Sequence, residues 1–168
     1  MGTSYVDVTD YYANNHSTAI KDDRVKYVLE NTSAGIIQGE LTFASVKGGF
    51  VPKQFNDPAD NFTAKDNAGY AASTAATFYT IEANKRYYFN NEAGAKAWIA
   101  SSLNTEGLLE SDIKVYTGGV CYYHIYLNRE NDYNVLRNQI YDVTIGKVNG
   151  IGEPGPGSVD PTQPVTQP

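Results

Sequence analysis

The chain has 168 residues, of which 41% are hydrophobic and 19% charged, with a formal net charge of −6 and an isoelectric point of about 4.8. This length predicts one domain with a sizeable core. The acidic balance argues against a nucleic-acid partner, because phosphate binding needs clustered lysine and arginine. The single cysteine excludes an intrachain disulfide, and no segment has the length of a membrane span.

Short strands and polar loops are expected in the N-terminal part of the chain. Residues 9–20 are polar and should be irregular, and alternation over Val25–Glu30 predicts the first strand. Leu41–Val46 predicts the second strand, which Lys47–Gly49 should end. Residues 56–69 are predicted to form a long polar insertion.

A hairpin and one helix are expected in the middle of the chain. Thr77–Ile81 and Lys85–Phe89 are β-rich runs on either side of a short polar turn, which predicts a hairpin. Asn90 or Asn91 should then cap a helix. The apolar stripe of that helix has the spacing i, i+3, i+4, i+7 and i+8: Ala95, Trp98, Ile99, Ser102 and Leu103.

Strand patterns return in the last third of the chain. Ile113 and Val115 resume the alternation, Val120–Leu127 is a longer strand, and Ile140–Ile145 is the last. In that last strand Tyr141, Val143 and Ile145 should face the core. Roughly seven short strands and one helix, broken by Gly, Pro and Asn, predict a mainly β, two-sheet antiparallel sandwich.

Residues 153–168 form a tail with almost no apolar side chains. The tail cannot bury enough surface to offset the entropy of ordering, so we expect an extended, disordered arm. At about 3.1 Å per residue it would reach roughly 50 Å. We therefore divide the chain into a domain, 1–152, and an arm, 153–168, which could equally be a plain linker. The arm holds five of the seven prolines: Pro154, Pro156, Pro161, Pro164 and Pro168.

Two stretches of the chain carry a family resemblance. The first is Tyr-Val-Leu-Glu-Asn-Thr at 27–32, and the second runs from Cys-Tyr-Tyr at 121–123 to an Arg-Asn pair and a tyrosine before the Gly/Pro tail. In this order they resemble the C-terminal domain of Bacteroidales fimbrillins, although Gln139 stands where that family usually has His. The residues that carry the resemblance are Tyr27, Leu29, Glu30, Asn31, Cys121, Tyr122, Tyr123, Arg137, Asn138 and Tyr141.

The resemblance implies a transthyretin-like sandwich and a structural role in a cell-surface fimbria, or pilus, that supports adhesion and biofilm formation. Such subunits assemble by donor strand exchange: a C-terminal strand fills a groove that opens in the next subunit when a protease removes an N-terminal strand. The partners would be other fimbrial subunits, with a host or bacterial surface receptor as a further option. Stalk, tip and anchor subunits share the fold and remain alternatives.

The resemblance also implies an extracellular location associated with the outer membrane. The parent protein would be a lipidated precursor with a domain upstream and a further strand after Pro168. Without these elements we expect the chain to be monomeric. We read Cys121 as a small buried hydrophobe rather than a reactive thiol. Arg137 either binds a partner's carboxylate or fixes local geometry.

No pattern of catalytic, cofactor-binding or metal-binding residues is found, so we expect no enzyme and no cofactor. The two histidines, His16 and His124, fit no zinc spacing, and no serine nucleophile elbow is present. Asp57, Asp60 and Asp66 could offer oxygen ligands to calcium, but we favour a solvated loop.

The second functional hypothesis is a cell-surface glycan-binding module. It rests on the 14 tyrosines, whose exposed rings could stack on sugars. Tyrosine at alternating strand positions more often packs against neighbouring strands, which favours the structural reading.

Overall fold

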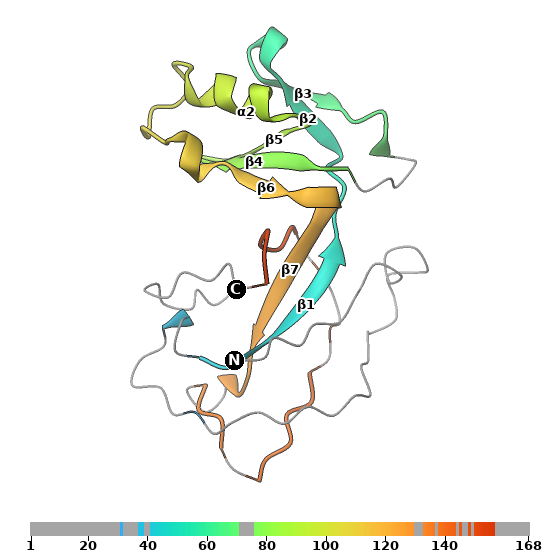
Figure 1. The fold of residues 1–168 in the computed structure, drawn as a ribbon, viewed down its shortest axis with the longest axis vertical. Coiled ribbons are helices and arrows are strands. Elements are labelled where there is room, and N and C mark those ends of the chain that lie inside the picture. The colour runs from blue at the N-terminus through green and yellow to red at the C-terminus, as the bar shows by residue number, and fades with distance from the viewer. Residues whose placement is uncertain are drawn as a thin grey trace. The chain divides into compact units, whose positions relative to one another are not determined.

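The computed structural model describes residues 31, 37–38, 41–70, 76–129, 133–136, 138–143, 145, 148 and 150–156. Over these residues the chain is mainly β, with seven strands in three sheets and one α-helix (Figure 1). The chain divides into two compact units. The central unit is Gly49–Cys121, and the terminal unit combines Met1–Gly48 with Tyr122–Pro168.

The central unit is built on a three-stranded antiparallel sheet in the order β5–β4–β6. These strands are β4 (Phe78–Glu82), β5 (Arg86–Phe89) and β6 (Lys114–Tyr116). The helix α2 (Glu92–Ile99) packs against β4 and β5, as Figure 1 shows. The core between helix and sheet consists of Ile81, Tyr87, Phe89, Ala95 and Trp98.

The predicted hairpin and the start of the predicted helix are confirmed. Asn91 caps α2, since its side-chain oxygen accepts a hydrogen bond from the backbone N–H of Gly94 at 2.8 Å. The expected continuation through Ser102 and Leu103 is wrong, because the helix ends at Ile99. Beyond that end the chain turns, and Leu103 is 38% exposed.

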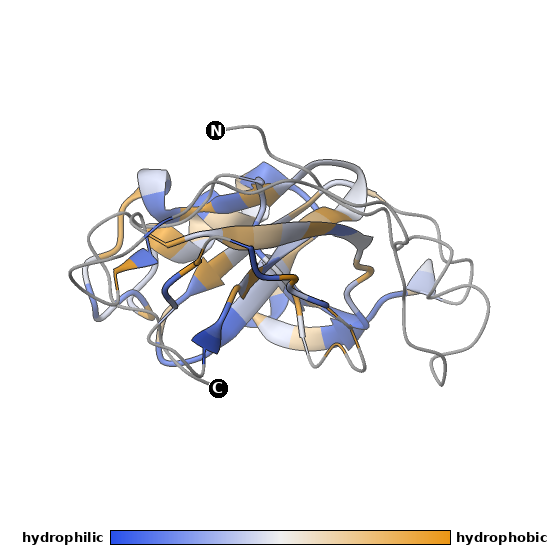
Figure 2. Cartoon of the chain, turned by 90° about the horizontal axis from the view of Figure 1, so that it is seen from below, coloured by the Kyte–Doolittle hydropathy of each residue, from blue (hydrophilic) through white to orange (hydrophobic). Residues whose placement is uncertain are grey.

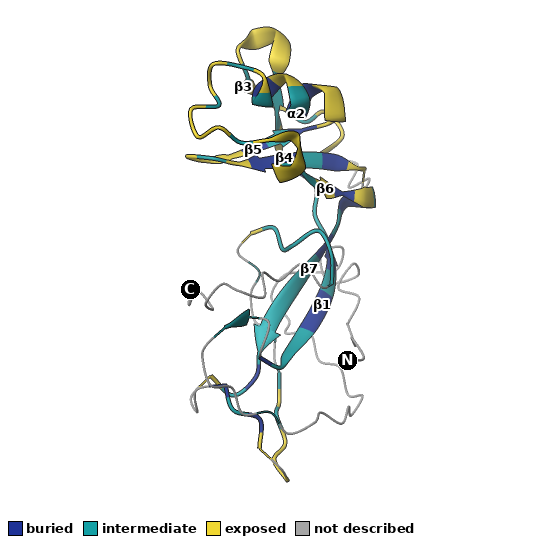
Figure 3. Cartoon of the chain, turned by 60° about the vertical axis from the view of Figure 1, so that its left-hand side comes forward, coloured by how far each residue is buried: buried dark blue, intermediate teal, exposed yellow. Residues whose placement is uncertain are grey.

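The expected long polar insertion is in fact a second hairpin. Strands β2 (Gln54–Asp57) and β3 (Thr63–Asp66) pair antiparallel around the short 3-10 helix η2 (Pro58–Asp60). The turn is completed by Asn61 and Phe62, which have positive φ angles of 46° and 59°. Every residue of β3 is exposed (yellow in Figure 3), so this strand lacks the apolar alternation by which strands are recognised.

The long strands β1 (Phe43–Gly49) and β7 (Val120–Tyr126) form a two-stranded sheet. Figure 2 shows hydrophobic and hydrophilic residues interleaved along the strands of the chain. The predicted end of β1 at Lys47–Gly49 is wrong, because the strand continues through both glycines. Pairing with β7 overrides the weak local preference of glycine for loops.

The two strands run antiparallel, as the hydrogen bonds beyond their ends show. Near one end, the N–H of Leu127 donates to the carbonyl of Thr42 at 3.0 Å. At the other end, the N–H of Phe50 donates to the carbonyl of Gly119 at 2.8 Å. The turn before β7 is the 3-10 turn η5 (Thr117–Gly119), whose two glycines have φ angles of 60° and 70°.

The expected last strand, Ile140–Ile145, is not a strand in the part of it that the structure describes: residues 140–143 are irregular and Ile145 forms only an isolated bridge. The predicted alternation is nevertheless present in the burial pattern. Ile140 is 97% exposed, whereas Tyr141, Val143 and Ile145 are half-buried. The predicted strand Val25–Glu30 lies outside the described residues. The mainly β, antiparallel class is confirmed, and a two-sheet sandwich fits it.

Candidate functional site

The outer edge of β7, opposite β1, carries a segment from the end of the chain. Tyr122 and Glu153 form an antiparallel bridge. The N–H of Tyr122 donates to the Glu153 carbonyl at 2.8 Å, and the N–H of Glu153 donates back at 2.7 Å. This reciprocal pairing is the unit from which antiparallel sheets are built.

Two side chains of β7 hold the same segment at its ends. The hydroxyl of Tyr123 donates to the Gly150 carbonyl at 2.9 Å. A ring nitrogen of His124, Nε2, lies 3.0 Å from the Pro156 carbonyl. Residues 150–156, which we call the strap, are therefore fixed on β7 at three places, and Figure 1 draws them in orange-red beside that strand.

The strap includes the first four residues of the expected disordered arm. Glu153 to Pro156 are half-buried. The prediction of disorder counted only apolar burial, and it left out the backbone pairing that holds this part of the segment at Glu153. The rest of the arm, including Pro161, Pro164 and Pro168, lies outside the described residues, so the division at 152/153 stays a prediction.

The two motifs of the family resemblance meet in the terminal unit. The N–H of Asn31 donates to the Val135 carbonyl at 3.0 Å, and the N–H of Val135 donates to the Asn31 carbonyl at 2.8 Å. The Asn31 side chain also donates to the Thr42 hydroxyl at 3.3 Å. Val135 is 1% exposed, so this junction is part of the core. Asn31 thus has a structural role beside the second motif.

Aromatic rings line β7 and the strand beside it. The ring of Phe43 meets those of His124 and Tyr126 edge-on, at centroid distances of 4.8 and 5.5 Å. Tyr126 also contacts Tyr133 at 6.2 Å. Burial raises the pKa of Tyr126, and the nearby Tyr133 adds to the effect. His124 is therefore packed against a ring and bonded to the strap.

The remaining signature residues have structural roles where the structure describes them. Cys121 is fully buried, in agreement with its reading as a small hydrophobe. Asn138 adopts a positive φ of 61°, a conformation that asparagine tolerates in turns. The hydroxyl of Tyr141 accepts from the Leu136 N–H at 2.9 Å and donates to Gln139 at 2.8 Å. Tyr27, Leu29, Glu30 and Arg137 lie outside the described residues.

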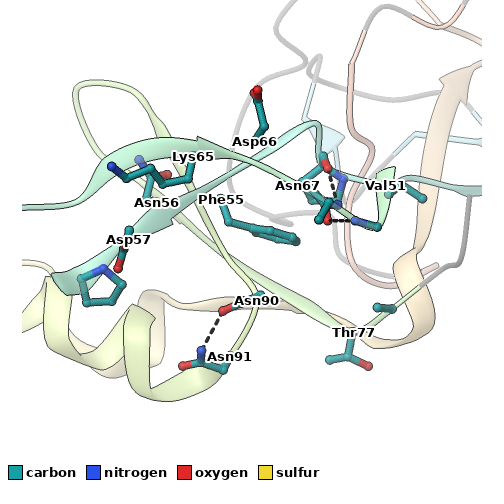
Figure 4. Close-up of a pocket in the computed structure, with 15 residues that line it drawn as sticks. Val51, Phe55, Asn56, Asp57, Lys65, Asp66, Asn67, Thr77, Asn90 and Asn91 are labelled. Carbon is teal, nitrogen blue, oxygen red and sulfur yellow. Dashed lines mark hydrogen bonds between the residues drawn. The ribbon is translucent and has the colours of Figure 1, made fainter. Parts of the chain in front are cut away.

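A hollow of about 700 Å³ lies in the central unit, beside the β2–β3 hairpin. Figure 4 shows the ring of Phe55 between that hairpin and the segments that carry Thr77 and Asn90, while Asp66 points away from it. No tyrosine is among the described residues that line the hollow, so the tyrosine-based glycan hypothesis gains no support from them.

Two of the four asparagines that line the hollow, Asn56 and Asn67, hold the hairpin beside it. Asn56 accepts from the N–H of Tyr88 at 2.8 Å and donates to the Phe62 carbonyl at 2.9 Å. Asn67 likewise accepts from Gly69 at 2.9 Å and donates to Pro52 at 2.8 Å. Both side chains therefore use their donor and acceptor groups in hydrogen bonds that hold the hairpin.

The three aspartates weighed as calcium ligands are also engaged separately. Asp57 accepts from the backbone N–H of Ala59 at 2.9 Å and caps η2. Asp60 pairs with Lys65, whose pKa is raised mainly by that hydrogen bond. Asp66 accepts from the Gln54 side chain at 3.0 Å.

No group of three metal-ligating side chains occurs among the residues that the structure describes. Over the same residues, no helix has the length and hydrophobicity of a membrane span.

Comparisons with known proteins give one match. Residues 114–168 match the family model described as major fimbrial subunit protein type IV, fimbrillin, C-terminal. No curated protein and no solved structure matches the chain. The matched segment includes β6, β7 and the strap, together with the second motif of the resemblance. The last third of this chain is therefore similar to the C-terminal domain of fimbrillins.

Proposed function

We propose that this chain is a structural subunit of a surface fimbria whose subunits are joined by strand donation. The family match over residues 114–168 carries the proposal, because fimbrillins are fimbrial subunits rather than enzymes. In this proposal β7 and its neighbours form the rigid body of the subunit. The arm after the strap connects that body to the strand that is donated.

The physics of assembly follows from the arm and from sheet pairing. A donated strand supplies main-chain hydrogen bonds, and its alternating side chains fill a groove in the acceptor. Each subunit donates a strand from one surface and accepts a neighbour's strand at another surface. The contacts are therefore heterologous and extend into a filament. Residues 157–168 add reach, at about 3.1 Å per residue for an extended proline-rich chain.

The finer features of the proposal come from the resemblance to Bacteroidales fimbrillins. The filament would be anchored at the outer membrane through a lipidated precursor, and it would support adhesion and biofilm formation. Its partners are the neighbouring fimbrial subunits, with a surface receptor at the tip as an option. These features are supported by the family match alone.

Immunogold electron microscopy of native cells, with antibody raised against this chain, tests the fimbrial role. We expect gold along filaments for a stalk subunit, and gold at filament tips or bases for a tip or anchor subunit. Gold scattered over the surface without filaments would overturn the proposal and favour the glycan-binding module.

Two changes in the parent gene test strand donation separately. Deleting residues 157–168 removes the reach of the arm and leaves the strap in place. The matched control replaces the same residues by a Gly/Ser sequence of equal length. We expect the deletion to abolish filaments and the control to keep them, since only reach is required. Filaments of normal length in the deletion strain would contradict strand donation through this arm.

A further inference from the structure

Strand β7 has the composition of a segment that pairs with itself. Residues 120–127 read Val-Cys-Tyr-Tyr-His-Ile-Tyr-Leu, without an aspartate, glutamate, lysine, arginine, proline or glycine. β-branched and aromatic residues favour extended structure, and the lack of charge removes repulsion between identical strands. An open edge on such a strand is a template for pairing with a second copy.

One edge of β7 pairs with β1, and the strap covers part of the opposite edge. The N–H of Leu127 donates to Thr42 on the β1 side. Backbone groups alternate in direction along a strand, so those of Tyr122, five residues away in the sequence, point to the opposite edge. That geometry explains why Tyr122 exchanges both of its backbone hydrogen bonds with Glu153 of the strap.

The strap is suited to end a sheet rather than to extend it. It is short, and prolines at 154 and 156 lack the N–H that a further strand would need. Edge strands are commonly protected by prolines and by short covering segments. The strap therefore covers β7 without itself offering a continuous edge.

A single glycine allows the strap to lie so close. A Cβ atom on Gly152 would stand 2.3 Å from the carbonyl oxygen of Tyr122 and 2.7 Å from its carbonyl carbon. Both atoms belong to the backbone of β7, so no side-chain rotation relieves the clash. A Cβ on Gly150, at the other end of the strap, would meet nothing within 4 Å. Glycine is therefore required at position 152 because any side chain there would clash with the backbone of β7.

We propose that the strap, residues 150–156, is an edge cap that prevents β7 from pairing with β7 of a second copy of this chain, and that Gly152 makes the cap possible. Lifting the strap exposes the Tyr122 edge of an uncharged strand. Two identical edges then pair antiparallel about a two-fold axis, which gives a closed dimer. This inference does not depend on the fimbrial function, because it concerns the isolated chain.

The test compares Gly152→Ala with Gly150→Ala in the full 168-residue chain. Sedimentation measures the mass, and amide hydrogen exchange measures the Tyr122 N–H that the strap protects. We expect the wild type and Gly150→Ala to stay at the monomer mass of 18.4 kDa. For Gly152→Ala we expect the Tyr122 amide to exchange about tenfold faster or more. The mass of this variant should rise with concentration toward that of a dimer.

A peptide and a milder variant keep the test decisive. The peptide Val-Asn-Gly-Ile-Gly-Glu-Pro-Gly-Pro, residues 148–156, should return Gly152→Ala to monomer when added in excess. Tyr123→Phe removes the hydroxyl that donates to the Gly150 carbonyl and should raise Tyr122 exchange by a smaller factor. Fluorescence of Trp98, in the central unit, checks that the variants are folded there.

Three results would overturn the inference. The first is a Gly152→Ala chain that exchanges rapidly at Tyr122 but stays monomeric, since the open edge would then not pair. The second is identical behaviour of the two alanine variants, which would mean that the close approach at Gly152 is unimportant. The third is a Gly152→Ala chain that associates and is not reversed by the peptide, because its association would then arise elsewhere.

Discussion

Asn56 should be the side chain whose loss most clearly releases the β2–β3 hairpin from the main sheet of the central unit. Its oxygen accepts from the N–H of Tyr88 at 2.8 Å, and its nitrogen donates to the Phe62 carbonyl at 2.9 Å. Tyr88 lies on β5, which is at the edge of the three-stranded sheet. One side chain thus joins an edge strand to the neighbouring hairpin and fixes the turn of that hairpin.

The expected cost of Asn56→Ala follows from these two bonds. A buried donor left without a partner costs about 1–3 kcal/mol, and an ordinary lost hydrogen bond about 0.5–1.5 kcal/mol. Both bonds are partly buried, and water can replace part of each, so we expect a total near the low end, about 2 kcal/mol. With a urea dependence of about 1–3 kcal/mol per molar, the unfolding midpoint should fall by about 1 M.

The assay uses the only tryptophan as a local reporter. Trp98 is 1% exposed and belongs to the central unit, so its fluorescence reports unfolding of that unit. Asn90→Ala is the matched control, because Asn90 is an exposed amide beside the same hollow. Its oxygen accepts a hydrogen bond from the exposed side chain of Asn91 at 2.7 Å, which water can replace, so the change in stability should be less than about 0.5 kcal/mol. Equal midpoints for the two variants would refute the structural role of Asn56.

Three further predictions concern single groups. The hydroxyl of Thr80 is fully buried and has no hydrogen-bond partner among the described residues. Thr80→Val should therefore raise the free energy of unfolding by up to about 1 kcal/mol in the same urea assay, and a lower free energy of unfolding would contradict this prediction. Asn91→Ala should cost about 1 kcal/mol through the lost cap of α2, and Asn91→Asp, which keeps the cap, should cost less. Because burial raises the pKa of Tyr126 above 10.0, its contribution is complete below pH 10.0 and is lost as pH rises through the raised value. Tyr126→Phe should remove that phase from alkaline unfolding followed by circular dichroism, and an unchanged profile would contradict the assignment.

Local patterns predicted the elements that carry their own signal in the sequence. The hairpin of β4 and β5 and the cap of α2 were found because alternation and capping act over a few residues. The hairpin of β2 and β3 was missed, since β3 is exposed on both faces and shows no alternation. The extent of β1 was missed because pairing with a strand more than 70 residues away, not local preference, extends it through its glycines.

The candidate site was predicted only in part for a related reason. Cys121 and Tyr122 were identified through the family resemblance, but their surroundings were not. The strap is held mainly by its backbone, which leaves little trace in residue type. The one available signal was Gly152, a glycine shortly before a proline in a stretch that otherwise reads as a flexible linker. A requirement for close backbone approach and a preference for flexibility look alike in a single sequence.

The hydrogen bond between Phe50 and Gly119 has a consequence for how such chains can change. It joins the two ends of the central unit, at 2.8 Å, close to where the chain enters that unit and where it leaves. The central unit is an insert between β1 and β7, and because its two ends lie together it does not force these strands apart. The entropy cost of closing such an insert rises only slowly with its length. The terminal unit could therefore keep its β1–β7 pair while the insert is lengthened, exchanged or replaced by a tight turn.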